Sequence, residues 1–340
     1  MPLLEVEDLR TQFRTEDGMI GAVDGVSFSV EKGQTLGIVG ESGSWKSVTC
    51  LTIMGLNDRR VTTTTGRALF DGQDLITMPG RDLQKLRGGR IAMIFQDPMT
   101  SLNPVHTIGR QIAEAVRLHQ DATRKQARAR GVELLQAVGI PRAESRFDDY
   151  PHQFSGGMRQ RVMIAMALVN DPDLLIADEP TTALDVTTQA QILQLMETLQ
   201  KDFGTAIIMI THDLGVVAEI CDEVVVMYAA RVVEQGNVDT IFKRPRHPYT
   251  WGLFGSLPRL DRDTERLTQI VGSPPSLLNP PSGCRFHPRC AYAFEQCPKV
   301  DPPLVADPRH PDHLDACLLD DATKDREGMR LLSGAMAEAG

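Results

Sequence analysis

The 340-residue sequence lacks three features that would direct a protein into a membrane, out of the cell or onto nucleic acid. No apolar run is long enough to cross a bilayer. The N-terminus MPLLEVEDLR carries early acidic residues and has neither the basic region nor the apolar region of a signal peptide. The net charge of −9 argues against nonspecific nucleic-acid binding, which needs an electropositive surface. The sequence therefore predicts a protein that stays in the cytoplasm and has no nucleic-acid partner.

Internal repeats and long low-complexity segments are also absent. The composition and the predicted secondary structure of the chain change once, at about residue 244. Up to residue 243, apolar strands alternate with helices, which predicts a mainly parallel sheet covered on both faces. From residue 244 onward, prolines cluster and four cysteines appear. We therefore expect one domain over residues 1–243 and a second over 244–340, with a helical subdomain at about 97–163.

Three shorter stretches carry weaker expectations. The alternation from Val26 to Val30 fits a half-buried strand among further strands and turns over residues 1–33. The threonine run 61–65 and the pair Asp71-Gly72 are predicted as surface turns. The polar stretch 320–340 is expected to be a weakly attached helix or tail.

A glycine is missing from a phosphate-binding motif. Residues 35–54 run as apolar strand, Gly/Ser turn and helix, the order that a P-loop requires. Lys46 would contact the β and γ phosphates and Ser47 would bind Mg²⁺, but the glycine expected before the lysine is Trp45. Taken alone, the stretch fits a structural turn as well as a nucleotide site. The residues expected to surround the phosphates are Gly40, Ser42, Gly43, Ser44, Trp45, Lys46, Ser47 and Val48.

An acidic pair ends an apolar strand further along the chain. Residues 174–178 are predicted as a buried strand that ends in Asp178, and Glu179 follows. An acidic residue at the carboxyl end of such a strand lies beside the P-loop in an open α/β sheet. We expect Asp178 to hold Mg²⁺ and Glu179 to orient an attacking water, the alternative being a solvated acidic pair.

A second anion-binding helix start is predicted at Ser155. Ser155 is followed by Gly156 and Gly157, and a plain helix cap does not explain two consecutive glycines, which lower helix propensity. Exposed N–H groups at a helix start bind phosphate. Two such starts in one chain predict a nucleotide held between two copies of this kind of domain.

The order of these motifs resembles the ATP-binding subunit of an ABC transporter. The sequence adds a glutamine loop at Gln96, a D-loop at 183–185 and a switch histidine at His212. The segments that resemble the dipeptide and oligopeptide importer ATPases more narrowly are 95–104, 154–161, 177–186 and 246–250. The resemblance implies an α/β fold of the P-loop NTPase type, with a mainly parallel sheet, an antiparallel β part, a helical subdomain and a small irregular Cys-rich C-terminal domain.

The same resemblance implies roles for single residues. Gln96 would sense Mg²⁺ and the γ-phosphate, and His212 would steady the transition state of ATP hydrolysis. Asp185 would communicate across a dimer. Phe13 stands where an aromatic ring would stack on adenine, although a lone Phe in a strand is equally a core residue.

The resemblance also implies partners and a cargo. The partners would be a second homologous ATPase subunit, in a heterodimer rather than a homodimer, two transmembrane permease subunits and an extracytoplasmic solute-binding protein. The chain would lie peripherally on the cytoplasmic face of the inner membrane. The cargo would be dipeptides or oligopeptides, while nickel chelates, glutathione or opines also fit. The rival interpretations are a non-hydrolysing regulatory subunit and an ABC-type ATPase that acts on nucleic acid or ribosomes.

The cysteines lack the close pair that is typical of structural zinc. Their spacing is C-x5-C-x6-C-x19-C, and in a reducing compartment four clustered thiolates indicate a soft-metal site. The resemblance implies a [4Fe–4S] cluster; zinc, and thiols that are unligated or disulfide-bonded, remain alternatives. The four residues are Cys284, Cys290, Cys297 and Cys317.

Trp45 is expected to impair the nucleotide site without unfolding the protein. A glycine-type backbone conformation costs a bulky residue about 1–3 kcal/mol. Such a cost is small beside a domain stability of about 5–15 kcal/mol. It would weaken ATP binding about tenfold to a hundredfold. The tryptophan would mark a naturally degenerate site, an introduced change or a tolerated variant whose indole faces solvent.

Overall fold

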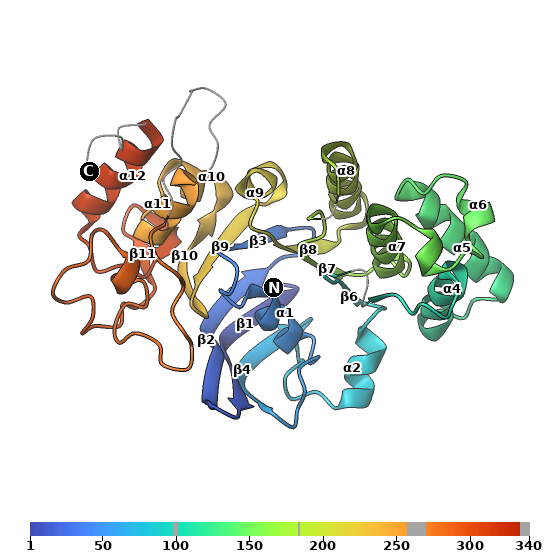
Figure 1. The fold of residues 1–340 in the computed structure, drawn as a ribbon, viewed down its shortest axis with the longest axis horizontal. Coiled ribbons are helices and arrows are strands. Elements are labelled where there is room, and N and C mark those ends of the chain that lie inside the picture. The colour runs from blue at the N-terminus through green and yellow to red at the C-terminus, as the bar shows by residue number, and fades with distance from the viewer. Residues whose placement is uncertain (98–100, 183, 257–269, 334–340) are drawn as a thin grey trace.

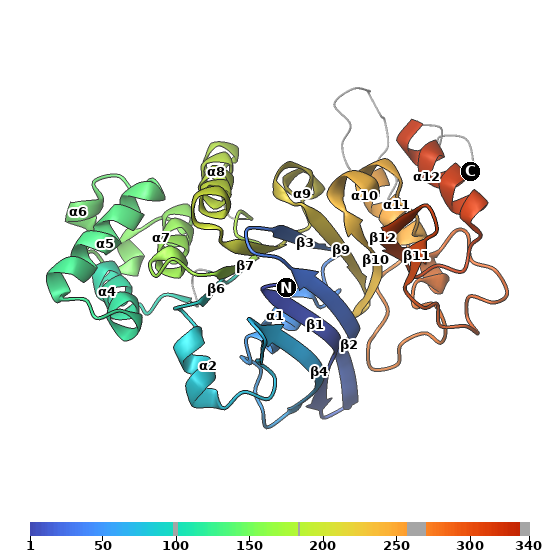
Figure 2. The same ribbon diagram turned by 180° about the vertical axis from the view of Figure 1, so that it is seen from behind.

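The computed structural model describes residues 1–97, 101–182, 184–256 and 270–333. A helical lobe and the C-terminal segment, which we define as residues 244–256 and 270–333, lie at opposite ends of the molecule (Figure 1, Figure 2). Helix α1 (Lys46–Ile53), which follows the P-loop, lies near the middle. No helix in the described ranges has both the length and the apolar character needed to span a bilayer.

The main sheet has eight strands in the order β11-β12-β10-β9-β3-β8-β7-β6. The five strands from β9 to β6 are parallel, as predicted, and β10, β12 and β11 continue the sheet in antiparallel fashion. Strands β3, β7 and β8 are buried along their whole length, as expected for apolar runs covered on both faces. The strands are β3 (Thr35–Val39), β6 (Ile91–Ile94), β7 (Leu174–Asp178), β8 (Ala206–Ile210), β9 (Glu223–Tyr228), β10 (Arg231–Asn237), β11 (Val305–Asp307) and β12 (His310–Asp315).

A second, antiparallel sheet has the order β2-β1-β4-β5. The prediction of a turn at the threonine run 61–65 is wrong, because Thr62 begins β4 and pairs with Phe13 of β1. β-branched threonines favour extended backbone, and that preference outweighs their polarity here. The turn at Asp71-Gly72 is confirmed. The strands are β1 (Leu4–Thr15), β2 (Gly18–Val30), β4 (Thr62–Phe70) and β5 (Gln73–Asp74).

The helical lobe consists of α4 to α7, and threonine caps begin two of its helices. Thr107 and Thr123 each accept a hydrogen bond from a backbone N–H in the first turn, which fixes where α4 and α5 begin. The helices among the described residues are α1, α2 (Gly80–Leu86), α4 (Ile108–His119), α5 (Arg124–Ala137), α6 (Ala143–Arg146), α7 (Gly156–Leu168), α8 (Val186–Phe203), α9 (Leu214–Ile220), α10 (Val238–Lys243), α11 (Pro248–Gly255) and α12 (Asp321–Ser333), with short 3-10 turns η1 (Pro151–Gln153) and η2 (His287–Arg289).

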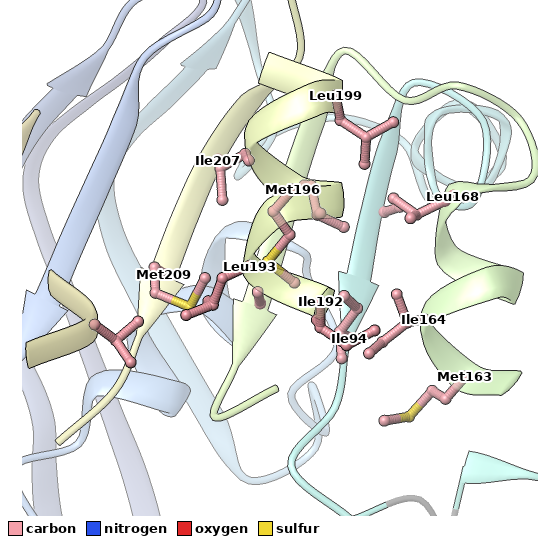
Figure 3. Close-up of a cluster of buried hydrophobic side chains, with 14 of the residues drawn as sticks. Ile94, Met163, Ile164, Leu168, Ile192, Leu193, Met196, Leu199, Ile207 and Met209 are labelled. Carbon is pink, nitrogen blue, oxygen red and sulfur yellow. The ribbon is translucent and has the colours of Figure 1, made fainter. Parts of the chain in front are cut away.

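Two hydrophobic clusters fix these layers. One cluster packs α1 between the antiparallel sheet and one face of the main sheet. The other packs α7 and α8 against the opposite face, where Ile164 and Ile192 meet Ile94 of β6 (Figure 3). Because α1 and α7 are both anchored to the main sheet, the two predicted anion-binding helix starts have fixed places on it.

The C-terminal segment is tied to the main sheet by strand pairing and by ion pairs. Its strand β12 pairs with β10, which precedes residue 244. The expectation of a weakly attached stretch after residue 320 is wrong for α12, because Lys324 and Glu327 are buried. Asp321 and Asp325 of this helix both pair with the buried Arg246. The boundary at residue 244 stays a prediction.

Candidate functional site

The P-loop turns sharply at Gly40, directly after β3. Gly40 has φ 150°, and a Cβ built on it would lie 2.2 Å from the carbonyl oxygen of Met227, so only glycine fits. The Lys46 ammonium lies inside the loop and donates to the carbonyl oxygens of Gly40 at 2.7 Å and Glu41 at 3.0 Å. Burial lowers the pKa of Lys46, while nearby carboxylates oppose that shift. The loop therefore encloses one cation beside a helix start, as a phosphate site requires.

Trp45 occupies the left-handed backbone position that a glycine would take. It has φ 68° and ψ 26° and stands at the N-cap of α1, with no side-chain capping bond. A bulky residue is strained in this conformation. The indole is half-buried, and its ring centre lies 6.4 Å from that of Phe13, so it is not turned fully to solvent. Two residues that the sequence presents as separate features are thus neighbours.

The predicted magnesium ligands meet at the carboxyl edge of the sheet. Ser47 Oγ, at the start of α1, donates to Asp178 Oδ1 at 2.9 Å. Burial raises the pKa of Asp178, and the hydrogen bond from Ser47 acts in the opposite direction. A hydroxyl and a carboxylate are ligands that suit Mg²⁺, so the donor set fits this ion.

Glu179 is the centre of the polar contacts beside Asp178. Gln96 Nε2 donates to Glu179 Oε2 at 3.2 Å, and His212 Nδ1 lies 3.3 Å from Oε1. Thr182 Oγ1 also donates to Oε2 at 3.0 Å. The sequence motifs did not predict Thr182 as a site residue. The only indication in the sequence is that it carries a hydroxyl three residues after the acidic pair. Because three polar groups converge on one carboxylate, its position is defined from several sides.

Two predicted site segments lie elsewhere. Ser155 caps α7 and accepts from the N–H of Met158 at 3.3 Å, and Asp185 caps α8 and accepts from the N–H of Thr188 at 2.9 Å. That backbone hydrogen bond lowers the pKa of the Asp185 carboxyl. Among the hydrogen bonds between described residues, none joins either cap to the P-loop. Ala183 of the predicted D-loop lies outside the described residues.

The other residues predicted to bind phosphate lie in the P-loop and at the starts of α1 and α7. Next to Gly156 there is open space for an added Cβ, so an approaching anion would meet the start of α7 unobstructed. Ser44 is buried and donates to the carbonyl oxygen of Glu41 at 2.8 Å, which closes the loop. The other predicted phosphate neighbours, exposed Ser42 and Gly43 and half-buried Val48, belong to the same loop and to the first turn of α1, and Gly157 belongs to the first turn of α7.

The four late cysteines line one small cavity of about 20 Å³, together with His247 and His287. All of them are free thiols. Burial raises the pKa of Cys290 and of Cys317 to about 12. Within the described residues, no group of three or more His, Cys, Asp or Glu is arranged to hold a metal ion. The structure thus gathers the cysteines but does not support the cluster or zinc.

Comparison with known families gives two matches. The model described as "ABC transporter" matches residues 23–182, and the model described as "Oligopeptide/dipeptide transporter, C-terminal region" matches residues 233–297. The oligopeptide transport ATP-binding protein OppD of Haemophilus influenzae is 55% identical over 304 residues, which cover 89% of this chain and 94% of the relative. The protein of the same name from Bacillus subtilis is 55% identical over 309 residues, covering 89% of this chain and 85% of the relative.

Solved structures agree with these matches. A dimeric ATP-binding cassette in a post-hydrolysis state, bound to ADP and Pi, superposes with a TM-score of 0.64 at 26% identity. The alignment covers 69% of this chain and 98% of that one. A subunit of an ABC transporter complex from Clostridium perfringens gives a TM-score of 0.58 at 31% identity, covering 71% of this chain and 90% of that one.

Proposed function

Because the chain belongs to the oligopeptide transport ATP-binding proteins of the ABC transporter family, we propose that it couples ATP hydrolysis to the uptake of oligopeptides or dipeptides. The P-loop NTPase fold expected from the sequence is confirmed by the cassette structures that it matches. ATP hydrolase activity follows from membership of this family. The observation that carries the proposal is the convergence of Gln96, Thr182 and His212 on Glu179, beside the Ser47–Asp178 pair.

In the proposed reaction, Lys46 leaves the loop carbonyls and contacts the β and γ phosphates. Ser47, Asp178 and Gln96 would hold Mg²⁺, which would supply positive charge to the phosphates. Glu179 accepts a hydrogen bond from the water that attacks the γ-phosphate in line. His212, whose ring faces Glu179 at 3.3 Å, stabilises the charge that develops on the transferred group.

The proposed assembly places the nucleotide between two ATPase subunits. The Ser155 helix start and Asp185 are exposed and lie apart from the P-loop of their own chain, so they are available to a partner's nucleotide. The matched cassette is itself dimeric. We propose a heterodimer with a second homologous subunit, bound to two permease subunits at the cytoplasmic face of the membrane and served by a solute-binding protein. Residues 1–243 would form the ATPase domain and 244–340 the C-terminal domain.

The test is ATP hydrolysis by the assembled transporter, measured with and without a loaded binding protein. Peptides that stimulate hydrolysis and are taken up support the proposal, whereas stimulation only by a nickel chelate, glutathione or an opine would change the cargo. A complex that hydrolyses ATP at the partner's site alone would make this chain the non-hydrolysing regulatory subunit. The left-handed backbone at Trp45 is the observation that favours this second role.

We also propose that Trp45 weakens this chain's own ATP site. The residue combines a left-handed backbone with an indole packed toward Phe13, the ring that would stack on adenine. Replacing Trp45 with Gly removes both the strain and the ring, and is expected to tighten ATP binding about tenfold to a hundredfold. Titration of the purified chain with a fluorescent ATP analogue measures the change.

Two further variants separate the causes at this position. Trp45→Ala removes the indole but keeps a Cβ at positive φ, so it should regain only the steric part of the loss. Phe13→Leu should weaken binding if the Phe13 ring stacks on adenine and leave it unchanged if Phe13 only fills the core. Equal affinities for the unsubstituted chain and Trp45→Gly would contradict the impairment.

For the cysteine cavity we propose a [4Fe–4S] cluster, with zinc as the alternative. Four thiols on one cavity are the right donors in kind, but the cavity of about 20 Å³ must open for either occupant. Protein purified without oxygen is expected to be brown, to absorb blue light and to contain iron and acid-labile sulfide. In the Cys290→Ser variant, the colour and the iron and sulfide contents should all be lower. The matched control is Cys50→Ser, on α1 and remote from the cavity. A colourless preparation that holds zinc would overturn the iron–sulfur assignment, and one without metal would leave four free thiols.

A further inference from the structure

The C-terminal segment reaches the P-loop at Glu41, the residue after its first glycine. The backbone N–H of Glu41 donates to the hydroxyl of Tyr249 at 2.7 Å. Tyr249 lies on α11 and is fully buried. A buried tyrosine hydroxyl that accepts from a loop N–H fixes the direction of that peptide group. The first turn of the P-loop is thus held from outside the predicted ATPase domain.

The side chain of Glu41 is held from the same direction. Arg289 approaches its carboxylate with two parallel hydrogen bonds, Nη1 to Oε2 at 2.7 Å and Nη2 to Oε1 at 3.0 Å. The Arg289 side chain is only 5% exposed. Bidentate arginine–carboxylate pairs are stronger and more directional than single hydrogen bonds. Glu41 is therefore fixed through both its backbone and its side chain.

Arg289 is itself held in place. Its guanidinium donates to the carbonyl oxygens of Val271 at 3.0 Å and Gly272 at 3.1 Å, and lies over the Tyr228 ring at 5.8 Å from the centroid. The Tyr228 and Tyr249 rings also contact each other, with centroids 4.7 Å apart. The two groups that hold Glu41 therefore belong to one packed unit.

Glu41 also contacts residues of the phosphate-binding loop through its backbone. Its carbonyl oxygen accepts from Lys46 Nζ at 3.0 Å and from Ser44 Oγ at 2.8 Å. The residues that line a cavity of about 320 Å³ beside the loop include Glu41 and His212, and also Leu253 and Ile270 of the C-terminal segment. The C-terminal segment is thus part of the wall next to the catalytic groups.

We propose that Arg289 and Tyr249 are positioning residues that fix Glu41, and through it the first turn of the P-loop, so that ATP affinity depends on the C-terminal segment. The inference rests on the proposed function, because it requires ATP at this loop. A loop that is already in its binding conformation loses less entropy when the phosphates arrive. Releasing Glu41 therefore lowers affinity without removing any group that contacts ATP.

The test compares conservative variants in nucleotide titrations of the full chain. Arg289→Lys keeps the charge but loses the two-pronged contact, and Tyr249→Phe removes only the hydroxyl. Arg289→Lys is expected to weaken binding of a fluorescent ATP analogue about tenfold, since hydrogen bonds to charged groups contribute on that scale. Tyr249→Phe removes a hydrogen bond between two neutral groups and is expected to weaken binding about threefold. In the assembled transporter, KM for ATP should rise by a similar factor while kcat changes little.

The matched control is Arg285→Lys. Arg285 lies on the same stretch and is also well buried, but it pairs with Asp24 and the carbonyl oxygen of Ala229 rather than with the P-loop. It should leave ATP affinity unchanged. Glu41→Gln combined with Arg289→Lys should be no worse than the more damaging single variant, whereas Glu41→Gln and Arg285→Lys should act additively. Equal thermal unfolding midpoints for the two arginine variants exclude a general loss of structure.

Two outcomes overturn the inference in distinguishable ways. If Lys46→Ala abolishes ATP binding while Arg289→Lys and Tyr249→Phe bind like the natural chain, the coupling to the C-terminal segment is wrong and the proposed function stands. If Lys46→Ala leaves binding unchanged, the P-loop is not the nucleotide site and both fail. Equal losses for Arg289→Lys and Arg285→Lys would also reject a specific role for Arg289.

Discussion

The Glu179→Gln variant is expected to bind ATP with near-normal affinity and to hydrolyse it about 10²- to 10⁴-fold more slowly, the range for loss of a positioned general base. The amide keeps the size of the side chain but cannot accept a proton from water. Its neighbours Gln96, Thr182 and His212 remain, so the site keeps its shape. Phosphate release by the assembled transporter at saturating ATP measures the effect.

Glu197→Gln is the matched control for this prediction. Glu197 is an exposed glutamate on α8 that makes a surface ion pair with Lys201, so the same chemical change should leave hydrolysis unaltered. ATP binding by the Glu179→Gln chain shows that the site still forms. A Glu179→Gln complex that hydrolyses ATP at the natural rate would mean that another group activates the water, or that the partner's site performs all the turnover.

Replacing Arg246 with Met is expected to lower the free energy of unfolding by about 3–5 kcal/mol, because it leaves buried carboxylates without their cation. The Arg246 side chain is 2% exposed and contacts Asp315 at 2.7 Å and Asp307 at 3.1 Å, both of which are themselves buried. Lys324 still neutralises Asp315 at 2.5 Å, whereas Asp307 would keep the exposed Arg309 at 3.4 Å and lose its buried cation. Urea unfolding of the purified chain, followed by tryptophan fluorescence, measures the loss.

Arg309→Met is the matched control in the same cluster. Arg309 contacts Asp307 and Asp325 but is itself exposed. Water can therefore solvate these carboxylates in place of Arg309, and the free energy of unfolding should change little. Loss of ATP binding in Arg246→Met at urea concentrations where the chain is still folded would show that the damage spreads to the P-loop. Similar, small shifts for both variants would mean that the buried ion cluster contributes little to stability.

Most of the main sheet could be predicted from the sequence because its central strands are short apolar runs. Residues 174–178 and 206–210 have no polar residue before the strand end, and burial on both faces is the only environment that suits them. Strands β11 and β12 could not be found in this way. His313 and Asp315 are polar or charged residues whose burial depends on their partners. His313 pairs with Glu234, and Asp315 pairs with Arg246.

The catalytic groups could be predicted as motifs, and their contacts could not. Ser47, Asp178 and Glu179 stand in local patterns that fix their position at a helix start or a strand end. The partners of Glu41 lie 208 and 248 residues away, and nothing in the sequence near Arg289 or Tyr249 indicates a phosphate-binding loop. Long-range packing of this kind is set by the tertiary structure alone.

The pairing of β12 with β10 has a consequence for how the chain is made. The acidic partners of Arg246 at positions 307 and 315 lie 61 and 69 residues after it, and a ribosome that adds 5–20 residues per second needs about 3–14 s to reach them. During that interval the nascent sheet ends at β10, an unpaired edge with a bare arginine beside it. While those residues are being added, the nascent chain therefore presents an unpaired edge strand, the kind of edge that pairs with other chains.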